Sequence, residues 1–97
     1  MRFVWDESKN TRNRKRHGVS FEQASTLFER GDEYLEIFDE AHSYDEDRFI
    51  AIGPISRGIV LVIYTEQEED IVRIISARFA TKREAEMYRS YVGGGSR

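Results

Sequence analysis

Three arginines lie in or beside stretches of the sequence that are predicted to be β-strands: Arg48, Arg73 and Arg78. A guanidinium group keeps its charge in a protein, and burying that charge is unfavourable unless a carboxylate or another anion pairs with it. Glu66, at the end of the strand predicted at residues 59–65, is one such carboxylate. The pattern therefore predicts either a binding site for an anionic ligand or structural ion pairs with Glu66 or another acid.

Phosphate is the anion that suits these side chains, because planar guanidinium groups bind its oxygens in pairs. An RNA phosphodiester also carries its own nucleophile, the 2′-hydroxyl group. An enzyme acting on it needs an in-line geometry, a base such as Glu66 or a histidine, and fixed positive charge at the developing phosphorane. Strict alternation places Arg73 with Ile71 and Ile75 and puts Arg78 on the opposite face, unless the strand bends between them.

The charges of the 97-residue chain are unevenly distributed, and its net charge of −3 hides this. Residues 9–16 carry five basic side chains and no acidic one: Lys9, Arg12, Arg14, Lys15 and Arg16. Residues 29–47 carry nine acidic side chains against Arg30 alone. A net negative charge argues by itself against a nucleic-acid-binding protein, but the distribution predicts a basic patch beside an acidic belt.

The composition predicts one soluble, cytoplasmic domain at residues 1–92 and a flexible tail at 93–97. There is no cysteine, so the chain has neither a disulfide framework nor a thiolate metal site. The N-terminus has no apolar targeting segment, and no apolar run approaches the length needed to span a membrane.

Hydrophobic periodicity and capping signals predict an α+β fold with the order β-α-α-β-β-β-β-α. Asp6 and Gly18 bound a polar first helix, which is expected to pack weakly because no apolar stripe runs along it. The segments 20–23 (SFEQ) and 81–84 (TKRE) are capping boxes that begin two further helices. Strands are predicted at residues 2–5, 34–38, 48–55, 59–65 and 71–78. The last three imply an antiparallel meander, within a mainly antiparallel sheet flanked by helices.

Two histidines, His17 and His42, are further candidates for chemistry. His17 ends the first predicted helix, where an imidazolium interacts favourably with the helix dipole even without a catalytic role. His42 lies in an acidic loop, where a solvated side chain is the simpler interpretation. Neither histidine has the spacing of a metal site and no glycine-rich phosphate loop is present, so no metal or cofactor is expected.

Five segments of the chain form a combination that is typical of one protein family. They are FVWDESK at 3–9, NRKRHGVSFEQA at 13–24, DEAHSYDEDRF at 39–49, VIYTE at 62–66 and IVRIISARFATKREAEMY at 71–88. With these segments the chain resembles the BrnT toxins of bacterial type II toxin–antitoxin systems, which have a RelE-like ribonuclease fold. One departure is Arg16, where the family commonly has Lys before His-Gly; arginine keeps the charge but lacks a titratable amine.

This resemblance implies a cytoplasmic ribonuclease toxin that needs no metal and blocks translation by cleaving RNA. Its expected partner is a BrnA-type antitoxin, and the toxin would contact operator DNA only through that antitoxin. A dimer, or a heterotetramer with the antitoxin, is the expected assembly, without membrane contact. The positions that match the family's motif residues are Arg48, Glu66, Arg73, Arg78, His17, His42 and Tyr88.

In the resulting hypothesis, Arg73 and Arg78 hold the scissile phosphate and stabilise its transition-state charge. Glu66 accepts the proton of the 2′-hydroxyl group or orients Arg73, and a cyclic phosphate is the product. Arg48 and the basic helix bind flanking phosphates. The side chains expected to bind substrate are Lys9, Arg12, Lys15, Arg16, His17, His42 and Tyr88. Two alternatives are a non-catalytic antitoxin-binding module, with its arginines in ion pairs, and a nucleic-acid-binding protein without nuclease activity.

Overall fold

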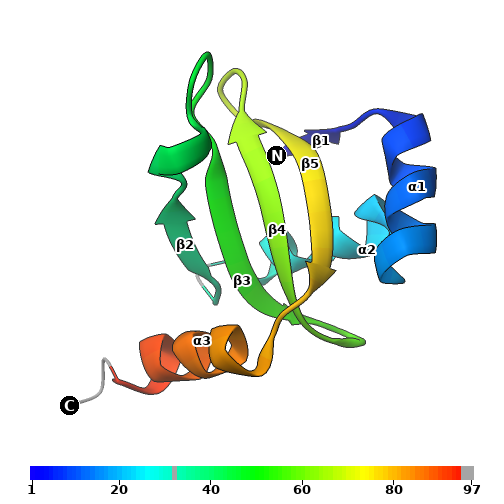
Figure 1. Cartoon of the computed structure of the whole chain (residues 1–97). Coiled ribbons are helices and arrows are strands. Elements are labelled where there is room, and N and C mark those ends of the chain that lie inside the picture. The colour runs from blue at the N-terminus through cyan, green and yellow to red at the C-terminus, as the bar shows by residue number, and fades with distance from the viewer. Residues whose placement is uncertain (32, 95–97) are drawn as a thin grey trace.

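A five-stranded sheet with the strand order β1-β5-β4-β3-β2 forms the centre of the molecule (Figure 1). The computed structural model describes residues 1–31 and 33–94. The strands are β1 (Arg2–Val4), β2 (Leu35–Phe38), β3 (Phe49–Ile55), β4 (Gly58–Glu66) and β5 (Ile71–Phe79). Strand β1 pairs in parallel with β5, whereas the pairs β2–β3, β3–β4 and β4–β5 are antiparallel. The predicted α+β fold with a mainly antiparallel sheet is confirmed.

Within residues 1–31 and 33–94, three α-helices and two short 3₁₀ helices flank this sheet. They are α1 (Glu7–His17), α2 (Phe21–Ser25), η1 (Thr26–Arg30), η2 (Glu40–His42) and α3 (Lys82–Gly94). Helix α1 begins where Asp6 accepts hydrogen bonds from two backbone N–H groups, and it ends at Gly18, whose φ of 75° is left-handed. Both predicted capping boxes are present, at 20–23 and at 81–84.

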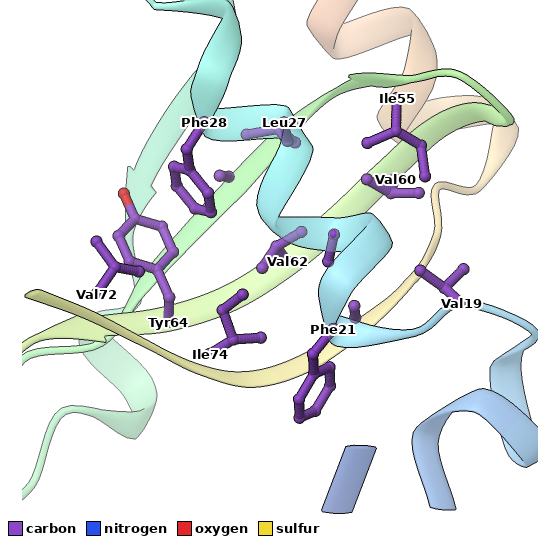
Figure 2. Close-up of a cluster of buried hydrophobic side chains, with 13 residues drawn as sticks. Val19, Phe21, Leu27, Phe28, Ile55, Val60, Val62, Tyr64, Val72 and Ile74 are labelled. Atoms are coloured by element: carbon purple, nitrogen blue, oxygen red, sulfur yellow. The ribbon is translucent and has the colours of Figure 1, made fainter. Parts of the chain in front are cut away.

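The hydrophobic core lies between one face of the sheet and the α2–η1 segment (Figure 2). Phe21, Leu27 and Phe28 project from this segment onto the buried side chains of β4 and β5. Tyr64 fills the space beside Phe28 and donates a hydrogen bond from its hydroxyl group to the Glu36 carboxylate. Each fully buried aliphatic or aromatic side chain stabilises the fold by about 1.5–3 kcal/mol, so this layer holds the strands in register.

Helix α3 contacts β2 and β3 and extends away from the end of the sheet where β5 finishes (Figure 1). The helix continues through Gly94, so the first two residues of the predicted tail at 93–97 are helical. Residues 95–97 of that predicted tail lie outside the described residues. Across the described part of the chain, none of the helices combines the length and the apolar character that crossing a membrane requires.

Candidate functional site

A β-bulge in β5 decides where its two arginines lie. Ile63 of β4 is paired with Ser76, but the next residue, Tyr64, is paired with Ile74, so Ile75 is an extra residue in β5. As a result Arg73 pairs with Thr65 and Arg78 with Leu61, two positions that share one face of β4. The extra residue shifts the alternation of side chains along β5. Arg73 and Arg78 therefore lie on the same face of the sheet, which strict alternation would not allow.

Arg73 shares the carboxylate of Glu46 with Arg48. The Nη2 atom of Arg73 donates a hydrogen bond of 2.6 Å to Oε2 of Glu46, and Nε of Arg48 lies 3.9 Å from the same oxygen. Glu46 belongs to the acidic segment before β3. The structural ion pair that the sequence offered as one alternative is thus present for Arg73, with Glu46 rather than Glu66 as its partner.

Arg78 is bound at the other end of β5 by Glu84 of α3. Two parallel hydrogen bonds of 2.9 Å join the guanidinium group to both carboxylate oxygens. The guanidinium lowers the pKa of Glu84 to about 2, and the same pairing raises the pKa of Arg78. The register partners of Arg73 and Arg78 are four residues apart on β4, which corresponds to about 13 Å. The three arginines consequently form two groups on one face and do not converge on a single point.

Glu66 lies apart from both groups. It is exposed at the end of β4, and its register partner is Val72, which is buried in the core. Residues paired across a sheet share a face, so Glu66 lies on the face opposite to Arg73. The structure does not bring Glu66 to the guanidinium that it was expected to orient, and a catalytic role for Glu66 stays a prediction.

A cavity of about 490 Å³ lies between α1 and β5, and it gathers the basic side chains of the helix. Its lining residues are Lys9, Arg12, Asn13, Lys15, Arg16, His17, Ile75 and Ser76. This lining contains no carboxylate, and in the described chain no ion pair neutralises its lysines or arginines. Ile75 and Ser76, at the bulge, place the cavity beside the part of β5 that separates Arg73 from Arg78. Five residues predicted to bind substrate are thus brought together here.

His42 and Tyr88, also predicted to bind substrate, do not line this cavity. The Nδ1 atom of His42 lies 3.0 Å from a carboxylate oxygen of Asp39, and the imidazole is exposed. The Tyr88 hydroxyl group, on α3, donates a hydrogen bond of 3.3 Å to the backbone carbonyl of Glu33. Both contacts are with residues close to β2, so these two side chains belong to the side of the molecule away from α1.

Comparison with known proteins identifies the family. The model of the family described as "Ribonuclease toxin, BrnT, of type II toxin-antitoxin system" matches residues 5–84. The chain belongs to the BrnT family. A crystal structure of the Brucella abortus ribonuclease toxin BrnT is similar to this BrnT-family chain, with a TM-score of 0.66 and 28% sequence identity. The similarity covers 84% of this chain and 99% of the Brucella chain. No curated protein matches the sequence.

Two asparagines dock the polar helix α1 of this BrnT-family chain. The buried Asn13 carboxamide donates to the carbonyl of Ala77 at 2.8 Å and accepts from the Ala77 N–H at 3.3 Å, as a neighbouring strand would. Asn10, also buried, accepts from the backbone of Phe21 and donates to Glu22. Most of the helix is exposed, as expected, and these two polar side chains dock it in place of apolar contacts. Asparagines at i and i+3 in a charged helix were the overlooked signal.

Membership of a type II toxin–antitoxin family implies an antitoxin partner for this BrnT-family chain. In the ranges 1–31 and 33–94, no three side chains of the His, Cys, Asp and Glu types come together as a group able to hold a metal ion. Two sets of charged groups are candidates for contact with a substrate: the cations of α1 and the two arginine–glutamate groups.

Proposed function

We propose that this BrnT-family chain is an endoribonuclease that cleaves RNA by metal-independent attack of the 2′-hydroxyl group and thereby inhibits translation. The observation that carries the proposal is the cavity between α1 and β5, where Lys9, Arg12, Lys15 and Arg16 converge without a carboxylate among them. Like charges held together repel one another unless an anion lies between them. A polyanion with regularly spaced phosphates is the ligand that satisfies such a site.

The proposed reaction uses the cations for charge and an imidazole for proton transfer. The 2′-oxygen attacks phosphorus in line with the leaving 5′-oxygen, a P–O bond forms, and the opposite P–O bond breaks. The products are a 2′,3′-cyclic phosphate and a free 5′-hydroxyl group. The cations of α1, with Arg73 on the adjoining face, stabilise the additional negative charge of the phosphorane, and Arg78, about 13 Å from Arg73 along the sheet, binds a flanking phosphate.

His17 is the side chain of the cavity that suits the proton transfer. It is partly buried at the end of α1 and lines the cavity, and histidine is the residue most often used in general acid–base catalysis. We propose that His17 accepts the proton of the 2′-hydroxyl group, a role for which Glu66 is the alternative, and that the leaving 5′-oxygen takes up a proton from water. Position therefore favours His17, because Glu66 lies on the other face of the sheet.

The proposed partners follow from the family. A BrnA-type antitoxin would bind this toxin in the cytoplasm, as a dimer or heterotetramer, and would supply the contact with operator DNA. The RNA substrate would occupy the cavity and the arginine face while the toxin is free of antitoxin.

The test is incubation of purified, antitoxin-free protein with RNA in the presence of EDTA. We expect cleavage products that end in a cyclic phosphate. His17→Gln and Arg73→Ala should each lower the cleavage rate at least about tenfold, since charge stabilisation and proton transfer each contribute that much or more. Arg14→Gln is the matched control, because Arg14 lies on α1 but outside the cavity lining. Full activity in a folded Arg73→Ala protein, or loss of activity on chelation, would contradict this mechanism.

One observation favours a second candidate function. Arg73 and Arg78 each have a carboxylate partner, as expected of a non-catalytic module that binds its antitoxin and nothing else. Such a module would bind the antitoxin with its ion pairs intact and would cleave no RNA in the same assay. A protein that only binds nucleic acid would instead show steeply salt-dependent RNA binding without strand scission.

A further inference from the structure

Glu46 occupies the space between two arginines that come from different parts of the sheet. One of its oxygens, Oε2, lies 2.6 Å from Arg73 and 3.9 Å from Arg48. This arrangement is built by the backbone, since the Thr65 hydroxyl group donates a 2.7 Å hydrogen bond to the carbonyl of Asp47. Thr65 is the register partner of Arg73 and lies on β4, between β5 and β3, so this bond holds the residue that follows Glu46 one strand away from Arg73. The position of Glu46 is therefore determined by the fold.

The Glu46 carboxylate accepts a hydrogen bond from only one of the N–H donors that the two guanidinium groups carry. Each arginine has five N–H donors, and Arg73 makes one hydrogen bond to Glu46 while Arg48 lies beyond hydrogen-bond distance of it. The three side chains remain accessible, with exposed fractions of 29% for Arg73, 36% for Arg48 and 37% for Glu46. A phosphodiester can reach this pair of arginines and can bond to both of them through two oxygens.

We propose that Glu46 is a positioning residue that holds Arg48 and Arg73 ready in the RNA-free protein and is displaced by a phosphodiester of the RNA. This inference rests on the proposed function, because RNA is taken as the ligand. The carboxylate substitutes for the phosphate, keeping the two cations at the spacing that the phosphate requires. RNA binding at this end of the sheet then replaces one anion by another and leaves neither arginine unpaired.

The test compares the affinity of charge-neutral variants for an RNA that cannot be cleaved. A single-stranded 2′-O-methyl oligonucleotide is bound to the full chain at fixed salt. Glu46→Gln should tighten binding by about threefold, the scale set by release of one exposed ion pair. The matched control is Asp45→Asn, which removes the same charge one residue earlier, where the exposed side chain has no partner in the described chain. The control should leave the affinity close to that of the parent protein.

A second variant separates this contact from general electrostatics. In a background with both Arg48→Gln and Arg73→Gln, Glu46→Gln should give no gain beyond that of Asp45→Asn, because neither guanidinium that Glu46 releases is present. Equal gains from the two acidic substitutions, or a gain that persists without both arginines, would overturn the inference. Tighter binding of an antitoxin without tighter binding of RNA would overturn it as well, because the ligand would then be a protein.

The oligonucleotide assay needs no chemical step, so its result is independent of cleavage. A parent protein that binds the oligonucleotide but fails to cut RNA contradicts the proposed function alone, and the gain from Glu46→Gln still supports the role of Glu46. A parent protein that cleaves RNA but shows no gain from Glu46→Gln contradicts only the inference about Glu46. Thermal unfolding of every variant confirms that the affinities compare folded proteins.

Discussion

Arg78 and Glu84 form a two-point ion pair that joins the end of β5 to the first turn of α3. Both hydrogen bonds measure 2.9 Å, and Oε1 of Glu84 also accepts the Thr81 backbone N–H at 2.9 Å. Glu84 is therefore a helix cap and an arginine partner at once. The same carboxylate sets the direction in which α3 leaves the sheet and the orientation of a guanidinium on the proposed RNA-binding face.

Replacing Glu84 should separate these two elements. We expect Glu84→Gln to lower the free energy of unfolding by about 1 kcal/mol, since it weakens a partly exposed ion pair and one capping hydrogen bond. Urea denaturation provides the measurement. Glu86→Gln is the control, because Glu86 is exposed on the same helix and forms no ion pair in the described chain. An equal effect of both substitutions would show that Arg78 does not contribute through Glu84.

The pH dependence of stability should report the same contact. The guanidinium of Arg78 lowers the pKa of Glu84 from 4.5 to about 2 in the folded chain. A folded-state pKa below the unfolded one means that the stabilisation is complete above about pH 4.5 and is lost as the pH falls toward 2. Unfolding measured from pH 6 to pH 2 should therefore show the parent protein and Glu84→Gln converging in acid. A constant difference over that range would exclude Glu84 as the titrating group.

The basic cavity should bind RNA through the charges that α1 presents on one side. Arg12→Gln combined with Arg16→Gln should weaken binding of single-stranded RNA about tenfold and make the slope of log affinity against log salt less negative by about 0.7 per lost phosphate contact. Arg14→Gln combined with Arg30→Gln removes the same charge from outside the cavity lining. Fluorescence anisotropy at several salt concentrations compares the pairs, and matching losses would show that net charge alone matters.

Asn13 should be needed both for stability and for the cavity. Asn13→Ala removes hydrogen bonds to the carbonyls of Val19 and Ala77 and leaves buried backbone groups unpaired. We expect a loss of about 2–3 kcal/mol in the free energy of unfolding. Thr11→Ala is the control on the same helix, because its hydroxyl group bonds only within α1 and its loss should cost less than about 0.5 kcal/mol. Chemical denaturation of both variants decides whether this docking contact has the expected strength.

Local signals in the sequence predicted most of the fold. The capping boxes, Asp6 and Gly18 correctly marked the helix boundaries, because a cap depends on residues three or four positions apart. Runs of β-branched residues likewise predicted the three strands of the meander, β3, β4 and β5, because strand propensity is also a local property of the sequence. Helix α3 continues through the glycines at 93 and 94, where the sequence predicted the start of a flexible tail. A glycine inside a helix costs only about 1 kcal/mol relative to alanine, and this cost is too small to determine where helix α3 ends.

The candidate site was only partly predictable. The sequence grouped the basic residues of 9–17, and all of them except Arg14 line the cavity, because neighbours on one helix stay neighbours in the fold. It could not supply the acid that meets Arg73, since Glu46 is 27 residues away and is positioned through Asp47 and Thr65.

By itself, the sequence determined the residue types, the caps, the strands and the family of this chain. Those features depend on short-range spacing and on side-chain chemistry. Only the tertiary structure decided that Arg73 and Arg78 share a face and that Glu66 lies on the other one. The physical reason is one extra residue at Ile75: a bulge forms when two strands are paired, and its position depends on how the core packs against both.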